Sequence, residues 1–339
     1  MAKVRWGVLG VAKIAVNRVI PGMQAGTNCE IAAIASRDLA RAREAAQGLG
    51  IPKAYGSYEE MLADPGIDAV YNPLPNHLHV PWSIRAAEAG KHVLCEKPVG
   101  LDAAETRQLI AARDRAGVVM GEAFMVAAHP QWRRLIELVR AGRIGKLQSA
   151  LGTFSYFKLE TGNIRNRRAY GGGGLYDIGC YPIKTSRMVF GEEPVRVQAA
   201  VVRDPRFENI DSLTSAVLEF PSGGHCVFTC STQIALQQSM CFYGTHGRIW
   251  PEIPFNAIPG GASRLFLDDG RDLQGGGRTI EEIAPCDQYT LQGEQFSRAI
   301  LEGGAPPVPL EDALRNMAVI DAVFRAAESG RPVAPDPLG

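Results

Sequence analysis

Short apolar runs alternate with amphipathic stretches over the first third of the chain. The apolar runs predict strands at residues 4–9, 31–35, 69–71, 92–95 and 118–121. Helical spacing of apolar residues lies between them, at residues 39–49, 58–62, 80–89 and 103–116. Strands and helices in alternation indicate βαβ units and a parallel, doubly wound sheet. Because these strands are apolar almost throughout, the sheet is expected to be covered by helices on both faces.

The pattern changes after Glu122. One more helix is predicted at residues 131–141, and alternating segments follow at 147–158, 195–202, 214–220, 226–232 and 240–243. Strands that succeed one another without helices between them favour an antiparallel sheet. Residues 221–224 have the proline and glycines of a hairpin loop. Helices are predicted at residues 288–301 and 311–329, whereas residues 253–277, rich in glycine and proline, are expected to form a loop.

These patterns predict an α/β protein of two domains. Residues 1–124 are expected to form a Rossmann domain, and residues 125–339 an α+β domain with a large, mostly antiparallel open sheet. The length of 339 residues also exceeds what one typical core accommodates.

The overall charge excludes some classes of partner. Lys plus Arg and Asp plus Glu number 36 each, so no net field would attract nucleic acid or an anionic membrane. The longest apolar stretch, residues 118–128, is too short to span a bilayer. The first residues do not resemble a secretion signal, and the seven cysteines lie in apolar surroundings without a Cys-x-x-Cys motif. A cytoplasmic protein with reduced thiols is expected.

The turn after the first strand has the spacing of a dinucleotide-binding motif. Its residues are Gly10, Val11, Ala12, Lys13, Ile14 and Ala15, which match G-x-G-x-x-G/A with Ala at the second and third glycine positions. Such a turn lets the amides at a helix N-terminus hold a pyrophosphate. Ala12 adds a methyl group where the backbone approaches phosphate, and a tight turn without a ligand is the alternative. The position after the first strand favours the dinucleotide.

The end of the second strand favours NADP(H) over NAD(H). A carboxylate at this position would bind the ribose hydroxyls and repel a 2′-phosphate, but Ser36 and Arg37 stand there, with Arg41 one helical turn later. A hydroxyl and guanidinium groups suit a phosphate dianion. A solvated Arg37 beside Asp38 as helix cap is the alternative, and use of both cofactors is common in such sites.

Ligands of open α/β sheets bind beyond the carboxyl ends of the strands. Four residues after one strand are predicted to line the nicotinamide ribose and amide pocket: Pro73, Leu74, Asn76 and His79. For His79 the alternative is a solvent-exposed histidine at a helix start. Glu96, Lys97 and Pro98 follow another strand, and in the second half the four glycines 171–174 lead into Asp177 and Tyr181, one helical turn apart.

At these motifs the chain resembles the glucose–fructose oxidoreductase, inositol dehydrogenase and rhizopine catabolism (Gfo/Idh/MocA) family. The resemblance covers nearly the whole length and includes the Gly10 turn, Glu96-Lys97-Pro98 and the glycine-rich lead into Asp177, Gly179 and Tyr181. Many members have His where Tyr181 stands. The Tyr, residues 122–125 and residues 163–165 are similar to the branch with glucose–fructose oxidoreductase, NADP-linked xylose dehydrogenases and dihydrodiol dehydrogenases.

The resemblance implies a mechanism. Tyr181 would be the acid/base, although a free tyrosine has a pKa near 10, and each unit of lowering takes about 1.4 kcal/mol of phenolate stabilisation. The ammonium of Lys97 would supply this attraction, and Lys97 as the proton carrier stays open. Asp177 would orient the substrate or keep Lys97 charged, whereas Glu96 would position the loop and cofactor. Pro98 is expected to follow a cis peptide bond.

Tyr156 and Arg165 are candidates for contacts with sugar hydroxyls. No His, Cys and carboxylate group has metal-ligand spacing, so no metal is expected. The predicted function is hydride transfer between NADP(H) and a sugar, either by aldose C1 oxidation or by keto-sugar reduction. A dihydrodiol or inositol-type dehydrogenase is the alternative enzyme, and a non-catalytic NADP-binding sensor is the alternative outside enzymes. The resemblance also implies a homodimer or homotetramer formed through the C-terminal sheet.

Overall fold

The computed structural model describes residues 2–337, and the contacts of the chain divide it into two compact units. The first unit runs to Ala128 and regains Asp287–Leu314, while the second comprises His129–Cys286 and the chain from Arg315 onward. The sequence pattern predicts one change of domain, after residue 124. It contains no signal that residues 287–314 return to the first unit.

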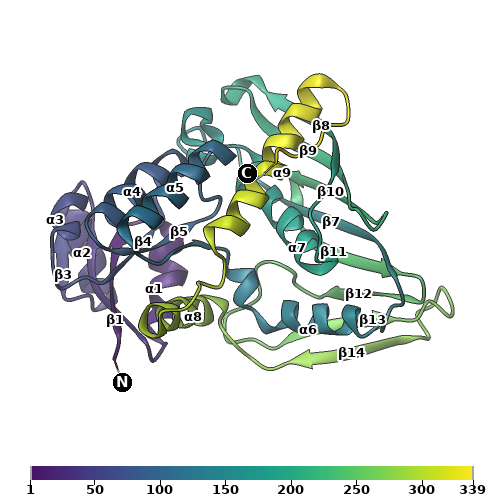
Figure 1. Cartoon of the computed structure of the whole chain (residues 1–339), viewed down its shortest axis with the longest axis horizontal. Helices are drawn as coiled ribbons and strands as arrows, with labels where there is room; N and C mark the ends of the chain where they lie inside the picture. Colours follow the sequence, from purple (N-terminus) through teal and green to yellow (C-terminus); the bar gives the residue numbers. More distant parts are fainter. Residues whose placement is uncertain (1, 338–339) are drawn as a thin grey trace. The chain divides into compact units, whose positions relative to one another are not determined.

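The first unit contains a six-stranded parallel sheet (Figure 1). Its strands are β1 (Val4–Leu9), β2 (Cys29–Ala35), β3 (Lys53–Tyr55), β4 (Ala69–Asn72), β5 (His92–Glu96) and β6 (Met120–Ala123). They follow the order β3-β2-β1-β4-β5-β6, so the chain builds outward from β1 in one direction and then from β4 in the other. This confirms the predicted doubly wound sheet. Strand β3 was not predicted because it has only three residues, none of them fully buried.

Two pairs of helices pack together in the first unit. The main helices of this unit are η1 (Ala15–Val19), α1 (Ile20–Gln24), α2 (Leu39–Leu49), α3 (Tyr58–Leu62), α4 (His79–Glu88), α5 (Ala103–Ala116) and α8 (Gln288–Glu302). Helix α1 packs on α8, and α4 packs on α5. Right-handed crossovers that run in opposite directions from β1 and β4 place the connecting helices on opposite faces of the sheet. The indole of Trp6 in β1 is fully buried and donates its Nε1–H to Ser297 Oγ of α8 at 3.1 Å.

The second unit is built on an eight-stranded sheet. Its strands are β7 (Leu147–Phe157), β8 (Arg196–Asp204), β9 (Ile210–Glu219), β10 (His225–Ser231), β11 (Gln233–Gly244), β12 (Gly247–Pro251), β13 (Ser263–Asp268) and β14 (Arg278–Ile283). Their order is β14-β13-β12-β11-β7-β10-β9-β8, and every neighbouring pair except β7 with β10 is antiparallel. The predicted α+β class and the hairpin loop between β9 and β10 are therefore confirmed.

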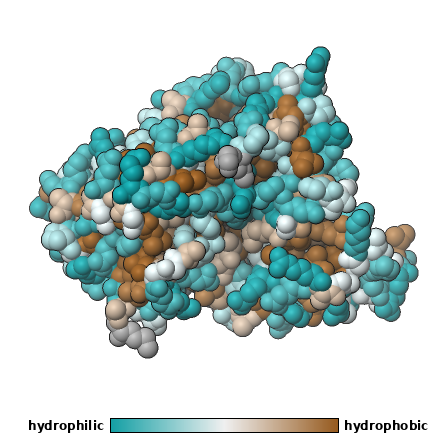
Figure 2. Space-filling model, viewed as in Figure 1, coloured by the Kyte–Doolittle hydropathy of each residue, from teal (hydrophilic) through white to brown (hydrophobic). Residues whose placement is uncertain are grey.

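One face of this sheet is covered by helices and the other is open. Helix α6 (Pro130–Arg140) packs on β12 and β13, and α7 (Cys180–Phe190) packs on β7. On the opposite face, Leu151, Val202 and Val227 are exposed. The surface in Figure 2 shows hydrophobic residues in patches between hydrophilic ones. Helix α9 (Leu310–Ser329) begins in the first unit and continues in the second.

The prediction of a loop at residues 253–277 is wrong in part, because β13 lies within it. Leu265 and Leu267 are buried, Arg264 is exposed, and the Phe266 ring stacks on Trp250 of β12 with centroids 5.3 Å apart. The glycines and prolines on both sides concealed this short alternation. The same composition hid β12 and β14, so the sequence showed only part of the sheet.

All seven cysteines lie among the described residues, and none forms a disulfide. Cys29, Cys95 and Cys180 are buried, as predicted. Burial raises the pKa of the Cys29 thiol to about 11. Within residues 2–337, every helix is too short or too polar to cross a membrane.

Candidate active site

The Gly10 turn has a backbone that glycine alone adopts without strain. Gly10 has φ +89°, and a Cβ there would lie 3.0 Å from Leu74 Cδ2 and 3.5 Å from Tyr58 Oη. Its amide donates to the Ala35 carbonyl at 2.8 Å, which fixes the turn against the end of β2. The helix that follows begins with amides that have no preceding turn to bond. Such a turn fits a dinucleotide pyrophosphate. Val11, Ala12 and Ile14 are half-buried around it, and Lys13 is exposed.

The end of β2 places two guanidinium groups in solvent. Arg37 and Arg41 are exposed, whereas Ser36 is buried and its Oγ accepts from the Asp38 amide at 3.1 Å. The Asp38 carboxylate accepts from the amides of Ala40 and Arg41 at 3.0 and 3.4 Å, so it caps α2. Asp38, the only carboxylate among residues 36–41, is therefore bound to the amides of α2. Arg37 and Arg41 then determine the charge that this segment presents to a ligand.

Tyr58 connects these arginines with the Gly10 turn. Burial raises the pKa of Tyr58, and the guanidinium groups of Arg37 and Arg41 oppose that shift, so both lie near its hydroxyl. The same hydroxyl is the atom 3.5 Å from the Cβ position of Gly10. A ligand bound at the Gly10 turn would therefore lie near the guanidinium groups of Arg37 and Arg41. Sequence reasoning missed Tyr58, because its position at a helix start carried no signal for a ligand site.

The segment after β4 is packed more tightly than the sequence predicts. Pro73 and Leu74 are buried, and Asn76 is half-buried in the short helix η2 (Asn76–Leu78). His79 is 1% exposed, and its ring nitrogens lie 2.7 Å from the carbonyl oxygens of Pro98 and Leu74. Both nitrogens face the protein itself. His79 is therefore not the solvent-exposed histidine given as the alternative, and its ring holds loops rather than facing outward.

The loop that carries Lys97 is fixed on both sides by carboxylates. Glu96 accepts from the hydroxyl of Tyr71 at 2.6 Å and from the Lys97 amide at 3.2 Å. Glu122, at the end of β6, accepts from the Val99 amide at 3.1 Å. The peptide between Lys97 and Pro98 is cis, as the resemblance predicts. Glu96 therefore contacts both β4 and the start of the loop, and Lys97 is half-buried beyond β5.

In the second unit three of the predicted residues meet. The Tyr156 hydroxyl donates to Asp177 Oδ2 at 2.5 Å, and Arg165 Nε lies 2.9 Å from the same oxygen. Burial, together with the Asp177 carboxylate, raises the pKa of Tyr156 well above its ordinary value. Asp177 raises the pKa of Arg165, which also interacts electrostatically with Tyr181. The Asp177 carboxylate is therefore held inside the second unit by two neighbours.

Tyr181 lies two positions into α7 with its ring in an aromatic group. It is buried, and the rings of Phe154 and Phe255 have centroids 5.3 Å from it. These rings fix the plane of the phenol, so its hydroxyl has little freedom. The helix before it, η6 (Leu175–Gly179), is a π-helix that carries Asp177. The four residues of this region thus form one cluster in the second unit, while Lys97 belongs to the first.

The glycine-rich loop before η6 rests on a buried carboxylate that sequence reasoning missed. Gly173 has φ +118°, and a Cβ there would lie 1.9 Å from Asp211 Oδ1. Asp211 Oδ2 accepts from the Leu175 amide at 2.6 Å and from Thr214 Oγ1 at 3.3 Å. Asp211 therefore anchors the start of the helix that carries Asp177. Nothing in the alternating pattern of β9 distinguishes this aspartate from a solvent-facing one.

Asp211 should make stability depend on pH. Burial raises the pKa of its carboxyl from 3.8 to about 7. Between these values the folded chain retains a proton that the unfolded chain loses, so the free energy of unfolding should fall as pH rises, by up to about 1.4 kcal/mol per pH unit. Above the pKa of Asp211 in the folded chain, both states have lost this proton and the free energy of unfolding no longer changes with pH through Asp211. Asp211→Asn cannot ionise and should lack this slope. Urea unfolding of both proteins at about pH 5 and about pH 7 measures it, and parallel pH dependences would contradict the assignment.

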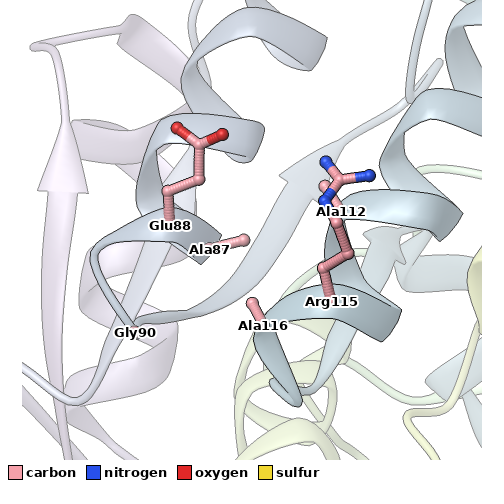
Figure 3. A pocket seen from close by; sticks show the side chains of 6 residues that line it. All are labelled: Ala87, Glu88, Gly90, Ala112, Arg115 and Ala116. Carbon is pink, nitrogen blue, oxygen red and sulfur yellow. The ribbon is translucent and has the colours of Figure 1, made fainter.

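An open hollow elsewhere in the first unit does not belong to this site. It is lined by residues at the ends of α4 and α5: Ala87, Glu88, Gly90, Ala112, Arg115 and Ala116 (Figure 3). These helices end where the next parallel strand begins, at the edge of the sheet opposite Gly10 and Lys97. Among the described residues no group of three or more His, Cys, Asp or Glu could hold a metal ion.

Comparison with known proteins connects both units to one family. Residues 4–124 match the oxidoreductase family with an NAD-binding Rossmann fold, and residues 132–250 match the Gfo/Idh/MocA C-terminal domain. An uncharacterized oxidoreductase of Rhizobium meliloti is 50% identical over 330 residues, which are 97% of this chain and 98% of that protein. The chain belongs to the Gfo/Idh/MocA oxidoreductase family. The expected Rossmann fold, oxidoreductase class and nicotinamide cofactor of this family member are thereby confirmed.

Two further relatives show which chemistry occurs in the family. An NADP(+)-linked D-xylose 1-dehydrogenase of Haloferax volcanii is 41% identical over 98% of this chain and 99% of its own. A solved 3-ketoreductase of Actinomadura kijaniata, in complex with NADP and TDP-benzene, matches with a TM-score of 0.89 and 31% identity, over 96% of this chain and 98% of that one. This Gfo/Idh/MocA oxidoreductase is therefore related to enzymes that act on sugars.

Proposed function

We propose that this protein is a cytoplasmic NADP(H)-dependent oxidoreductase that oxidises an aldose at C1. Tyr181 is the acid/base and Lys97 its electrostatic partner, and both act on the same substrate hydroxyl. The observation that carries the proposal is the Lys97 loop, which Glu96 and Glu122 fix beyond the carboxyl end of β5. Ligands of doubly wound sheets bind at this edge. Nucleotide binding is assigned to the first unit, which includes residues 287–314, and substrate binding and oligomer formation to the second.

The proposed reaction takes a hydride from C1 and a proton from its hydroxyl. The nicotinamide, when bound, supplies the hydride acceptor. Tyr181 removes the hydroxyl proton, and the ammonium of Lys97 stabilises the phenolate and polarises the substrate oxygen. Arg165 adds a second positive charge near Tyr181. Tyr156 is not assigned as the base, because its proton is held by the Asp177 carboxylate, and burial together with this carboxylate raises the pKa of the Tyr156 phenol.

The charges of the second unit favour an uncharged, hydroxyl-rich substrate. Three cations on segments around the cluster are paired with carboxylates: Arg165 with Asp177 at 2.9 Å, Arg167 with Glu208 at 3.2 Å and Lys158 with Glu160 at 3.5 Å. A phosphorylated sugar would have to compete with these carboxylates. A neutral aldose needs only hydrogen bonds, for which Tyr156, Arg165 and Asp177 are suited. Reduction of a keto-sugar is the second candidate, because the related 3-ketoreductase has that activity by name.

The same ketoreductase supports the choice of Lys97 and Tyr181. Solved forms of it carry a substitution at one lysine or at one tyrosine, and those two positions are separated by the same number of residues as Lys97 and Tyr181. A non-catalytic sensor would need neither residue, so this correspondence favours an enzyme over a sensor.

A substrate screen tests the proposal. D-xylose, other aldoses, inositols and vicinal diols are offered with NADP+ and with NAD+, and the reduced nicotinamide is followed by its absorbance. Turnover of an aldose with NADP+ is the expected result. Turnover only of inositols or diols would support the alternative dehydrogenase. NADPH binding without turnover of any compound would support the sensor.

Arg37→Asp should shift the cofactor preference toward NAD+. The exposed guanidinium is a partner for the 2′-phosphate, and a carboxylate in its place would repel that phosphate and accept from the ribose hydroxyls. We expect the ratio of kcat/KM for NADP+ to that for NAD+ to fall at least about tenfold. Arg43→Asp, also exposed on α2, is the matched control for charge. An equal shift in both variants, or none in Arg37→Asp, would refute the role.

We also propose that the open face of the large sheet joins two copies of the chain. Leu151, Val202 and Val227 leave apolar side chains exposed on this face. Val227→Lys should therefore give a smaller species than the wild-type dimer or tetramer in sedimentation velocity at micromolar concentration. Val195→Lys, an exposed valine outside the strands, is the control. A monomeric wild type would contradict the proposal.

A further inference from the structure

The ring of His79 bridges two loops that the proposed function uses. Nδ1 lies 2.7 Å from the carbonyl oxygen of Pro98, next to Lys97, and Nε2 lies 2.7 Å from the carbonyl oxygen of Leu74. The Leu74 side chain in turn lies against Gly10, where its Cδ2 is 3.0 Å from the Cβ position. One buried imidazole thus lies between the lysine loop and the nucleotide turn. Its position relative to both is set by two short contacts.

Both partners of the ring are carbonyl oxygens, which only accept hydrogen bonds. The number of protons on the ring nitrogens therefore determines to how many of these oxygens the ring can donate. A neutral imidazole has one N–H donor and one lone pair. Burial lowers the pKa of His79 to about 4. The charges of Lys97 and His77 also lower this pKa, whereas the carbonyl groups of Pro98 and Leu74 raise it. At neutral pH the ring therefore has one proton. It donates to one carbonyl and presents a lone pair to the other.

The two loops differ in what else holds them. Leu74 is also fixed through its amide, which donates to Asn72 Oδ1 at 3.3 Å, and the Asn72 amide group donates to the His79 carbonyl and to Ser83 Oγ at 3.0 Å each. Glu96 and Glu122 hold the amides of Lys97 and Val99 on either side of Pro98. Pro98 itself has no amide proton, so its carbonyl is the only polar backbone group by which this residue can be fixed. A hydrogen bond from the His79 ring is therefore more important for fixing Pro98, through Nδ1, than for fixing Leu74, through Nε2.

We propose that His79 is the positioning residue for Lys97, and that it acts by donating its Nδ1–H to the Pro98 carbonyl. This bond fixes the peptide that follows Lys97 and so sets the position of the ammonium relative to the substrate hydroxyl. The inference rests on the proposed function of Lys97. Nothing about the role requires His79 to touch the cofactor or the substrate, and NADPH affinity should not depend on it.

Two amide side chains test the two nitrogens separately. His79→Asn places its amide nitrogen as many bonds from Cα as Nδ1, and His79→Gln places it as many bonds from Cα as Nε2. His79→Asn should keep kcat within about threefold of the wild type, whereas His79→Gln and His79→Ala should lose about tenfold or more, because a small displacement of a catalytic group is costly. The dissociation constant of NADPH, from the change in its fluorescence, should stay within about twofold in all three.

The ring itself is examined in the wild-type protein with bound NADPH. Nitrogen-15 NMR of labelled histidine distinguishes a protonated from an unprotonated ring nitrogen, and the expected result for His79 at neutral pH is a proton on Nδ1. This measurement also decides the matter if the Asn or Gln variant does not fold. A proton on Nε2, or a kcat retained in His79→Gln and lost in His79→Asn, would overturn the proposal. Equal losses of kcat in both variants would also overturn it, as would a weaker NADPH affinity. Lys97→Ala is assayed in parallel: if it keeps full turnover the proposed function itself fails, whatever His79 does.

Discussion

Lys97→Ala is expected to lower kcat by about 10²- to 10³-fold, the loss seen when one group that stabilises transition-state charge is removed. The phenolate of Tyr181 and the substrate oxygen would both lose their ammonium partner. NADP+ affinity should change by less than about twofold, since the proposed contacts of the nucleotide are the Gly10 turn and Arg37. Initial rates with the best aldose and NADPH fluorescence titrations measure the two effects.

The control is Lys3→Ala, which removes an exposed lysine of the same unit. It should leave both quantities unchanged. A Lys97→Ala enzyme with an unaltered kcat would remove Lys97 from the mechanism. A large loss of NADP+ affinity would instead make Lys97 a cofactor ligand.

Tyr181→Phe is expected to lower kcat by about 10²- to 10⁴-fold, the range for removal of a general acid or base. The change removes one oxygen and keeps the ring that packs on Phe154 and Phe255, so the fold should be retained. Tyr156→Phe is the matched variant, because it removes a phenol hydroxyl whose proton is bound to Asp177. Its main effect should be on KM, because the Asp177 carboxylate would lose the hydrogen bond that helps to fix its position.

The two variants are compared by kcat and KM for the same aldose, with melting temperature as the check on folding. If Tyr156→Phe lost more kcat than Tyr181→Phe, the acid/base role would pass to Tyr156. Equal and small losses in both would point to Lys97 as the proton carrier, the possibility that the sequence leaves open.

The first unit was predictable because its strands are buried on both faces. Continuous apolar runs such as residues 4–9 and 92–95 have few other interpretations, and the rule that ligands bind at strand ends then led to Gly10 and Lys97. β12, β13 and β14 escaped prediction because they are short and flanked by glycine and proline. Their pairing depends on partners distant in sequence, which a local pattern does not contain.

The candidate site was predictable in its residue types but not in its support. The sequence predicts separate roles for Asp177 and for the pair Tyr156 and Arg165, and the structure joins all three around one carboxylate oxygen. Asp211 and Tyr58 were missed because their importance comes from contacts across many residues of sequence: Asp211 lies beneath Gly173, and Tyr58 lies beside Gly10. The sequence predicts His79 in the nicotinamide pocket, but its burial between two carbonyl groups has no signature in the sequence.

The return of Asp287–Leu314 to the first unit has a consequence for any attempt to produce the nucleotide-binding half alone. A fragment that stops at Ala128 would lack α8, and the Trp6 indole would lose both its hydrogen-bond acceptor Ser297 and its ring contact with Phe296. Such a fragment would expose part of its own core to water. The first unit is formed by two separate stretches of the chain. A fragment that folds alone would therefore need α8 joined to Ala128 through a new linker.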